Sequence, residues 1–314
     1  MRSLVTGAAG FVGRHLVAHL LSRGHEVGGL VHPSDGGPGS LGPRVDVFPL
    51  DILDETALGA ALSDFAPDAV YHLAAFSNPE GSWKEARRTL ETNIIGAHNL
   101  LSAAKETGRK PRVLLVGSAQ QYGDVPAEAQ PIGEDREQRP LTPYAVSKTS
   151  QELLGRRSVW SEELPVYVTR SFNHTGPGQA DGYVSSSFAR QVAEVERGAR
   201  EPIIRVGNLG ARRDFTDVRD VAAAYFAIVE KGKPGRPYNV CRGEAVSIRE
   251  VLDELVRLAR VPVEVVVDPD RYHALDAPLM VGDPTRLKTD TGWSPRYSLS
   301  ETLRDLLDDW RSRL

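Results

Sequence analysis

Cysteine is almost missing from this sequence, which has one, Cys241, among 314 residues. A single cysteine excludes an internal disulfide framework and is typical of a protein in a reducing cytoplasm. The eight histidines are scattered without the short spacings of a zinc site, so we expect no metal. These shortages predict a cytoplasmic protein with neither structural disulfides nor a metal centre.

Long apolar runs and basic clusters are missing as well. No stretch is long enough to cross a bilayer, so we expect no membrane partner. The first residues enter a strand pattern directly, without a signal-peptide layout. The formal net charge of −4 and the isoelectric point near 6.1 disfavour nucleic acid as the main partner. With 40% hydrophobic and 25% charged residues, the composition is that of an ordinary globular protein.

Short apolar runs alternate with amphipathic segments through the first half of the chain. Buried strands are predicted at residues 2–6, 25–31, 45–49, 68–73, 112–117 and 166–171. Helices are predicted between most of them, including one from Phe11 to Arg23 and a long one over 83–107. This βαβ alternation predicts an α/β fold with a doubly wound parallel sheet of the Rossmann type.

The rhythm becomes irregular after residue 171. Helices are expected near 184–198, 217–231, 247–260 and 299–312, with short apolar runs at 203–206 and 263–267. We therefore expect a nucleotide-binding domain over 1–171, to which segments near 215–242 return, and a smaller mixed substrate-binding lobe over 172–314. The lobe should cover the carboxyl ends of the strands, where open α/β sheets bind ligands.

Three glycines, Gly7, Gly10 and Gly13, join the first predicted strand to the first predicted helix. Glycines at such a junction permit a tight turn, close approach of the backbone to a pyrophosphate, and close packing of the helix on the strand. The helix N-terminus then faces the phosphates. Because strand and helix flank the turn as required, it predicts a dinucleotide site, in which we include Phe11 and Val12.

The end of the second predicted strand bears on the choice of cofactor. It reads Val31-His32, without the acidic residue that usually contacts the ribose hydroxyl of NAD. An acid there would repel a 2′-phosphate, so we expect NADPH, with NADH possible. His32 is a candidate for holding that phosphate, and the alternative is an exposed loop histidine without a role. Asp51, after the third strand, could contact the adenine edge or merely cap the next helix. Ile52 and Ala74 complete the predicted cofactor site.

The run Tyr144-Ala-Val-Ser-Lys148 follows a threonine and a proline. Thr142 is a good N-cap and Pro143 a preferred first helical residue, so Tyr144 and Lys148 should share one face of a helix. An ammonium beside a phenol favours the phenolate and lowers a pKa that starts near about 10. Tyr144 could then exchange a proton with a substrate oxygen near neutral pH.

Ser118 follows the fifth predicted strand and should lie near the Tyr144 helix at the edge of the sheet. There it could donate a hydrogen bond to a substrate oxygen. A serine after a strand is by itself usually a turn residue. Beside Tyr144 and Lys148, a catalytic role is the better interpretation.

Several of these motifs together resemble the extended short-chain dehydrogenase/reductase family, which acts mostly on nucleotide sugars: the glycine turn, Ser118 and Tyr144-x-x-x-Lys148. Three further segments are similar to the GDP-mannose 4,6-dehydratase branch, above all to its reductases: Arg170-Ser-Phe-Asn-His-Thr-Gly-Pro-Gly-Gln, Gly207-Asn-Leu-Gly-Ala-Arg-Arg-Asp-Phe and Tyr238-Asn-Val-Cys. The resemblance implies an oxidoreductase that reduces the C4 ketone of GDP-4-keto-6-deoxy-mannose to GDP-rhamnose. It also implies a homodimer formed through helices 83–107 and 143–160.

The resemblance also implies a set of substrate-binding residues. Asn173 and Arg213 would hold the nucleotide diphosphate, and Asp276 the guanosine ribose. Arginine suits this role because its guanidinium makes forked contacts to phosphate. For Arg213, an ion pair with Asp214 or Asp217 is the alternative.

Gln120 bears on which reaction we expect. Family dehydratases carry an acid two positions after the serine or threonine, and removal of the C5 proton next to a transient C4 ketone needs such a base. An amide cannot accept that proton, so Gln120, which we place in the substrate site, favours a reductase. A dehydratase that uses Glu134 or Asp135, a 4-epimerase and a non-catalytic dinucleotide-binding protein stay as alternatives.

Overall fold

The computed structural model describes residues 1–35, 41–268 and 277–314. In this part of the chain, seven parallel strands form the central sheet: β1 (Arg2–Thr6), β2 (Glu26–Val31), β3 (Val45–Pro49), β4 (Ala69–His72), β5 (Arg112–Ser118), β6 (Val166–Ser171) and β10 (Pro237–Val240). Their order is β10-β6-β5-β4-β1-β2-β3. The order reverses between β1 and β4, as in dinucleotide-binding sheets, and ligands bind at that point.

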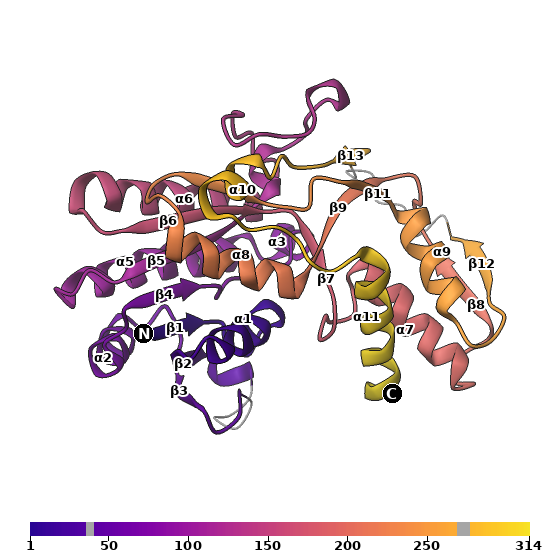
Figure 1. Ribbon diagram of the computed structural model, residues 1–314, viewed down its shortest axis with the longest axis horizontal. Helices are drawn as coiled ribbons and strands as arrows, with labels where there is room; N and C mark the ends of the chain where they lie inside the picture. The colour runs from indigo at the N-terminus through magenta and orange to yellow at the C-terminus, as the bar shows by residue number, and fades with distance from the viewer. Residues whose placement is uncertain (36–40, 269–276) are drawn as a thin grey trace.

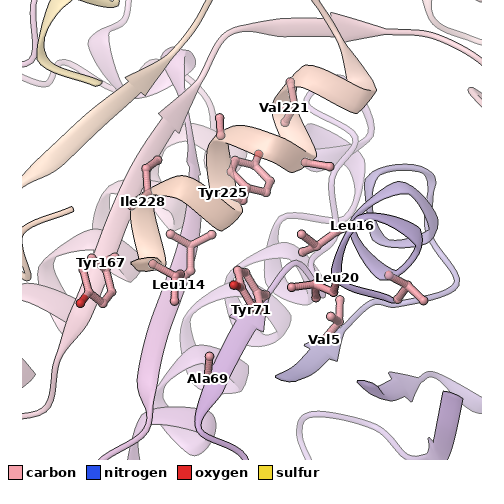
Figure 2. Close-up of a cluster of buried hydrophobic side chains, with 14 of the residues drawn as sticks. Val5, Leu16, Leu20, Ala69, Tyr71, Leu114, Tyr167, Val221, Tyr225 and Ile228 are labelled. Atoms are coloured by element: carbon pink, nitrogen blue, oxygen red, sulfur yellow. The ribbon is translucent and has the colours of Figure 1, made fainter. Parts of the chain in front are cut away.

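Helices cover both faces of this sheet (Figure 1). One face carries α1 (Phe11–Ser22) and α8 (Val218–Lys231); the other carries α2 (Glu55–Phe65), α5 (Gly96–Glu106) and α6 (Pro143–Glu162). Figure 2 shows how α8 turns Val221, Tyr225 and Ile228 toward the sheet, where Tyr71 and Leu114 project from β4 and β5. The expected doubly wound α/β fold is therefore confirmed.

The predicted long helix over 83–107 is wrong as a single α-helix. The segment is divided into α3 (Gly81–Lys84), α4 (Ala86–Leu90), a π-helical turn (Glu91–Ile95) and α5. Inside the π-helical turn, the Asn93 side chain accepts a hydrogen bond from Phe76 N at 2.8 Å and donates one to Ser147 Oγ at 2.8 Å. These contacts join the helix to residues distant in the sequence, and helical periodicity alone does not predict them.

The second half of the chain forms a smaller assembly beside the sheet (Figure 1). Its helices are α7 (Val184–Glu196), α9 (Ile248–Leu258) and α11 (Leu299–Arg313), which bury a separate apolar core that includes Phe188, Leu252 and Leu306. Its strands are β7 (Asn173–Thr175), β8 (Ile203–Val206), β9 (Arg212–Asp217), β11 (Ala245–Ser247), β12 (Glu264–Val267) and β13 (Leu279–Met280). Helix α10 (Thr285–Thr291) packs against α8 and β10.

Several short elements of this half are not predicted from the sequence. The elements that were missed are β7, β9, β10, β11, β13 and α10. They have between two and seven residues, and segments so short or so polar carry no clear periodicity. β10 lies beside β6 in the central sheet, and α8 packs on α1. The division into a domain over 1–171 and a lobe over 172–314 stays a prediction. No helix within the described ranges is both long and apolar enough to span a membrane.

Candidate active site

The glycine turn between β1 and α1 leaves no room for side chains. Gly7 has φ +65°, and a Cβ there would lie 2.9 Å from Ala74 N, at the end of β4. A Cβ on Gly13 would collide with the Gly7 carbonyl oxygen. Gly10 is the N-cap of α1 and has no side chain that could accept hydrogen bonds from the N–H groups of the first turn. The turn therefore suits a pyrophosphate between β1 and β4. Ala74 lies beside the turn, and its contact with the cofactor stays a prediction.

His32 and Asp51 follow neighbouring strands and lie close together. His32 Nε2 is 3.6 Å from Asp51 Oδ2, and His32 Nδ1 is 2.7 Å from Ser34 Oγ. The alternative role of Asp51 as the helix cap is wrong, because Asp54 caps α2 by accepting a hydrogen bond from Ala57 N. Asp51 instead accepts one from Leu53 N. Its contact with the adenine stays a prediction.

Ile52 and Phe11, both predicted to bind the cofactor, pack against other side chains or backbone of the chain in this structure. Ile52 is buried, and its side chain packs where a Cβ on Gly96 would lie. The Phe11 ring stacks on His174, 6.1 Å between centroids, and so joins the start of α1 to β7. Val12 packs at the edge of the core under α1. The cofactor contacts of these three residues stay predictions.

Tyr144 and Lys148 lie one turn apart at the start of α6, where Thr142 and Pro143 act as predicted. Thr142 Oγ1 accepts a hydrogen bond from Ala145 N at 3.0 Å, and Pro143 occupies the first turn. Tyr144 is 9% exposed and Lys148 3%. Lys148 Nζ lies 6.0 Å from the centroid of the Tyr144 ring.

The predicted lowering of the Tyr144 pKa is wrong for this structure. Burial raises the pKa of Tyr144 to about 12, while its hydrogen bond with Ser118 acts in the opposite direction. Burial also lowers the pKa of Lys148 to about 7. The ammonium does not favour the phenolate because Lys148 Nζ donates instead to Val116 O at 2.8 Å and to Gln151 Oε1 at 3.0 Å. Tyr144 is thus a neutral phenol at pH 7, able to donate its proton.

Ser118 ends β5 and is held by a short turn that follows it. Its Oγ accepts a hydrogen bond from Gln120 N at 3.2 Å, and its own N–H donates to Gln121 Oε1 at 2.8 Å. Gln121 Nε2 in turn donates to Glu152 Oε2 at 2.8 Å, on α6. The structure therefore brings Ser118 to the Tyr144 helix, as the sequence predicts. Gln120 is half-buried directly beyond Ser118.

The two loop carboxylates that could replace an acid at position 120 are bound elsewhere. Glu134 is buried, and its Oε1 accepts a hydrogen bond from Asn239 N at 2.9 Å in β10. Asp135 is exposed and pairs with Arg286 Nη2 at 2.7 Å, in α10. Both contacts tie the loop to β10 and α10, and this disfavours either carboxylate as the base of a dehydratase.

Asn173 and Arg213 lie on paired parallel strands. Asn173 opposes Phe215 across β7 and β9, so it lies on the same side as Arg213, two residues earlier. The alternative ion pairs of Arg213 are not formed: Asp217 binds Arg219, and Asp214 accepts backbone hydrogen bonds, among them one from Gly243. Asp276, predicted to bind ribose, lies outside the described residues. Diphosphate binding by Asn173 and Arg213 stays a prediction.

The fold and these motifs define an NAD(P)-dependent enzyme of the extended short-chain dehydrogenase/reductase class. The sequence model of the family described as GDP-mannose 4,6 dehydratase matches residues 4–306, so the chain belongs to that family. The expected class, family and oxidoreductase activity are confirmed.

Three matches, one by sequence and two by structure, illustrate the range of activities among similar proteins. The chain is 38% identical to GDP-6-deoxy-D-mannose reductase of Pseudomonas aeruginosa, an alignment that covers 100% of this chain and 98% of the relative. The solved structure of RMD from Pseudomonas aeruginosa complexed with NADPH has a TM-score of 0.88 and 36% identity, covering 100% and 99% of the two chains. UDP-glucose 4-epimerase of Thermus thermophilus, complexed with NAD, has a TM-score of 0.89 and 30% identity, and both chains are covered completely.

Proposed function

We propose that the protein reduces the C4 ketone of GDP-4-keto-6-deoxy-D-mannose to GDP-D-rhamnose. The proposal rests on one observation. The site combines Ser118, Tyr144 and Lys148 with an amide, Gln120, at the position where dehydration needs a carboxylate. The 38% identity to a GDP-6-deoxy-D-mannose reductase over the whole chain supports the same reaction.

The neutral Tyr144 suits the reductive direction. Reduced nicotinamide, when bound, supplies the hydride for C4. The developing alkoxide then needs a proton, and the Tyr144 phenol donates it because burial keeps that phenol protonated. Ser118, hydrogen-bonded with Tyr144, polarises the C4 carbonyl, and Lys148 holds the ribose of the nicotinamide.

NADPH is the cofactor we propose, with NADH as a poorer substitute. The glycine turn suits a dinucleotide of either kind, since its backbone is open to a pyrophosphate. The strand-end positions Val31 and His32 carry no acid that would repel a 2′-phosphate. The RMD structure that this chain resembles holds NADPH.

We also propose that the protein is cytoplasmic. This proposal rests on Cys241, which is buried as a free thiol.

The reaction itself can be tested against its main alternative. Purified protein should consume one NADPH for each molecule of GDP-4-keto-6-deoxy-D-mannose that it reduces. The absorbance of the reduced nicotinamide measures this consumption. GDP-mannose, incubated without reduced cofactor, should stay unchanged because Gln120 cannot take the C5 proton. Parallel reactions with NADH and with the UDP- and dTDP-linked 4-keto sugars define specificity. Efficient formation of the 4-keto-6-deoxy product from GDP-mannose alone would instead make the protein a dehydratase.

We also propose that the protein is a homodimer. Five large apolar side chains are exposed on α6 and on the segments that precede α5. Val146, Leu153 and Trp160 lie on α6, Trp83 lies on α3, and Ile95 ends the π-helical turn. Val146, Leu153 and Trp160 recur every seven residues, so they form a stripe on one side of α6. An exposed apolar stripe of this kind fits a second copy of the chain.

Disrupting this stripe should separate the subunits. Leu153→Glu places a charge at a position that is 52% exposed, where the monomer can solvate it, so folding should be preserved while the dimer dissociates. Sedimentation velocity at micromolar concentration measures the change. The matched control is Val267→Glu, a similarly exposed apolar residue on β12, which should leave the sedimentation coefficient unchanged. Wild-type protein that sediments as a monomer would contradict the proposal.

A further inference from the structure

Gln151 lies three residues after Lys148 on α6 and is 1% exposed. Its Oε1 accepts a hydrogen bond from Lys148 Nζ at 3.0 Å, and the same ammonium donates to Val116 O at 2.8 Å. The acceptors that hold the buried lysine are thus a backbone carbonyl and one side-chain amide. Only the amide depends on the identity of a residue.

Packing alone does not explain a glutamine at this position. Within the described residues, Gln151 Nε2 is buried and has no hydrogen-bond partner. A buried polar group without a partner costs free energy, and an apolar side chain of similar length would fill the space without that cost. The contact of Gln151 Oε1 with Lys148 is the feature that an apolar residue could not provide.

The charge of Lys148 is surrounded by few groups that could stabilise it. Two titratable groups face the ammonium, Tyr144 on the same helix and His72 on β4. His72 stays neutral, because burial and the charge of Lys148 lower its pKa to about 3. Glu152, the next residue along α6, is bound to Arg170 of β6. In the described part of the chain no carboxylate pairs with Lys148, which leaves its charge to be stabilised by hydrogen-bond acceptors.

We propose that Gln151 is a positioning residue that keeps Lys148 protonated and directed along one side of the cofactor site. The proposal deepens the function proposed above and rests on it for the role of Lys148 at the nicotinamide ribose. A hydrogen bond to the charged form of a group favours that form. Removing the Gln151 carbonyl therefore favours the neutral amine, and replacing it with a carboxylate favours the ammonium.

The direction of the pH dependence follows from the charge on Lys148. Two N–H groups of the ammonium donate to Val116 O and Gln151 Oε1, and the third is left for a ribose hydroxyl. Loss of the charge weakens that contact, so affinity for NADPH should fall as pH rises through the pKa of Lys148. Gln151→Met should move this fall to lower pH by about one unit, and Gln151→Glu should move it to higher pH by about 1–3 units. The measurement is the Kd of NADPH from nucleotide fluorescence over a pH range that extends at least two units below and above the wild-type transition. These variants and the wild type are compared at equal ionic strength.

A second readout requires neither cofactor nor sugar. Titration of the lysine ¹³Cε resonances by NMR, with Lys148 assigned through Lys148→Arg, reports the pKa of the amine directly. The matched control is Gln191→Met. Gln191 lies on α7 and is equally buried, at 1% exposure, and its Oε1 accepts a hydrogen bond from Arg205 N on β8. This control should lower stability but leave the Lys148 titration in place.

These readouts separate the inference from the proposed function. If the protein fails to reduce the GDP-linked ketone while Gln151→Met and Gln151→Glu shift the Lys148 titration in opposite directions, the substrate is wrong and the role of Gln151 stands. If both variants only destabilise the fold, as is expected of Gln191→Met, and the titration stays at its wild-type position, Gln151 is a packing residue and the inference is overturned.

Discussion

Tyr144→Phe is expected to lower turnover by about 10²–10⁴-fold, the usual contribution of general acid catalysis. The substitution keeps the ring that packs at the start of α6 and removes only the hydroxyl that is hydrogen-bonded with Ser118. Since burial raises the pKa of Tyr144 to about 12, the wild-type phenol carries its proton near neutral pH. The measurement is kcat for GDP-4-keto-6-deoxy-D-mannose with saturating NADPH.

The Kd of NADPH should change little in this variant, because Lys148 and the glycine turn are intact. Tyr71→Phe is the matched control: Tyr71 is fully buried in β4, and its hydroxyl has no hydrogen-bond partner in the described ranges. Losing that hydroxyl should leave kcat near the wild-type value. A Tyr144→Phe enzyme as active as Tyr71→Phe would show that another group donates the proton.

Six strands of the central sheet were predictable because each is a short apolar run bounded by polar or turn residues, whereas β10, with the sequence Pro-Tyr-Asn-Val, was not expected as a strand. β6 illustrates this, since Val166–Ser171 has the bounds expected from the sequence. The meeting of Ser118 with the Tyr144 helix was predictable for a related reason: ligands of parallel α/β sheets collect at the carboxyl ends of the strands.

The sign of the Tyr144 pKa shift was not predictable from spacing. A separation of four residues places Tyr144 and Lys148 on one helical face, but it says nothing of burial or of where a long lysine side chain points. In the folded chain Lys148 reaches Val116 O on β5, a contact of residues 32 positions apart. The π-helical turn at Asn93 escaped prediction for the same reason, since its partners Phe76 and Ser147 are brought near by tertiary packing.

Glu152→Ala should destabilise the protein by about 3–5 kcal/mol, because it leaves Arg170 as a buried charge without its partner. The Arg170 guanidinium is bidentate on Glu152, with distances of 2.9 Å and 2.7 Å, and the two side chains are 3% and 1% exposed. Burial of both charges is costly, so the pair is stable only while each has the other. Urea unfolding followed by tryptophan fluorescence gives the change in free energy.

Two further variants and a turnover measurement test the role of the Glu152–Arg170 pair. Glu91→Ala removes the exposed partner of Arg87, and such surface pairs contribute about 0–1 kcal/mol, so this variant should unfold almost as the wild type does. The double variant Glu152→Leu/Arg170→Met removes both buried charges and should recover part of the loss. Turnover of folded Glu152→Ala should also fall, because Gln121 loses the carboxylate that orients it toward Ser118 N. If Glu152→Ala cost no more free energy than Glu91→Ala, the buried pair would stabilise the fold no more than an exposed pair does, and unchanged turnover would show that Glu152 does not orient Gln121 toward Ser118.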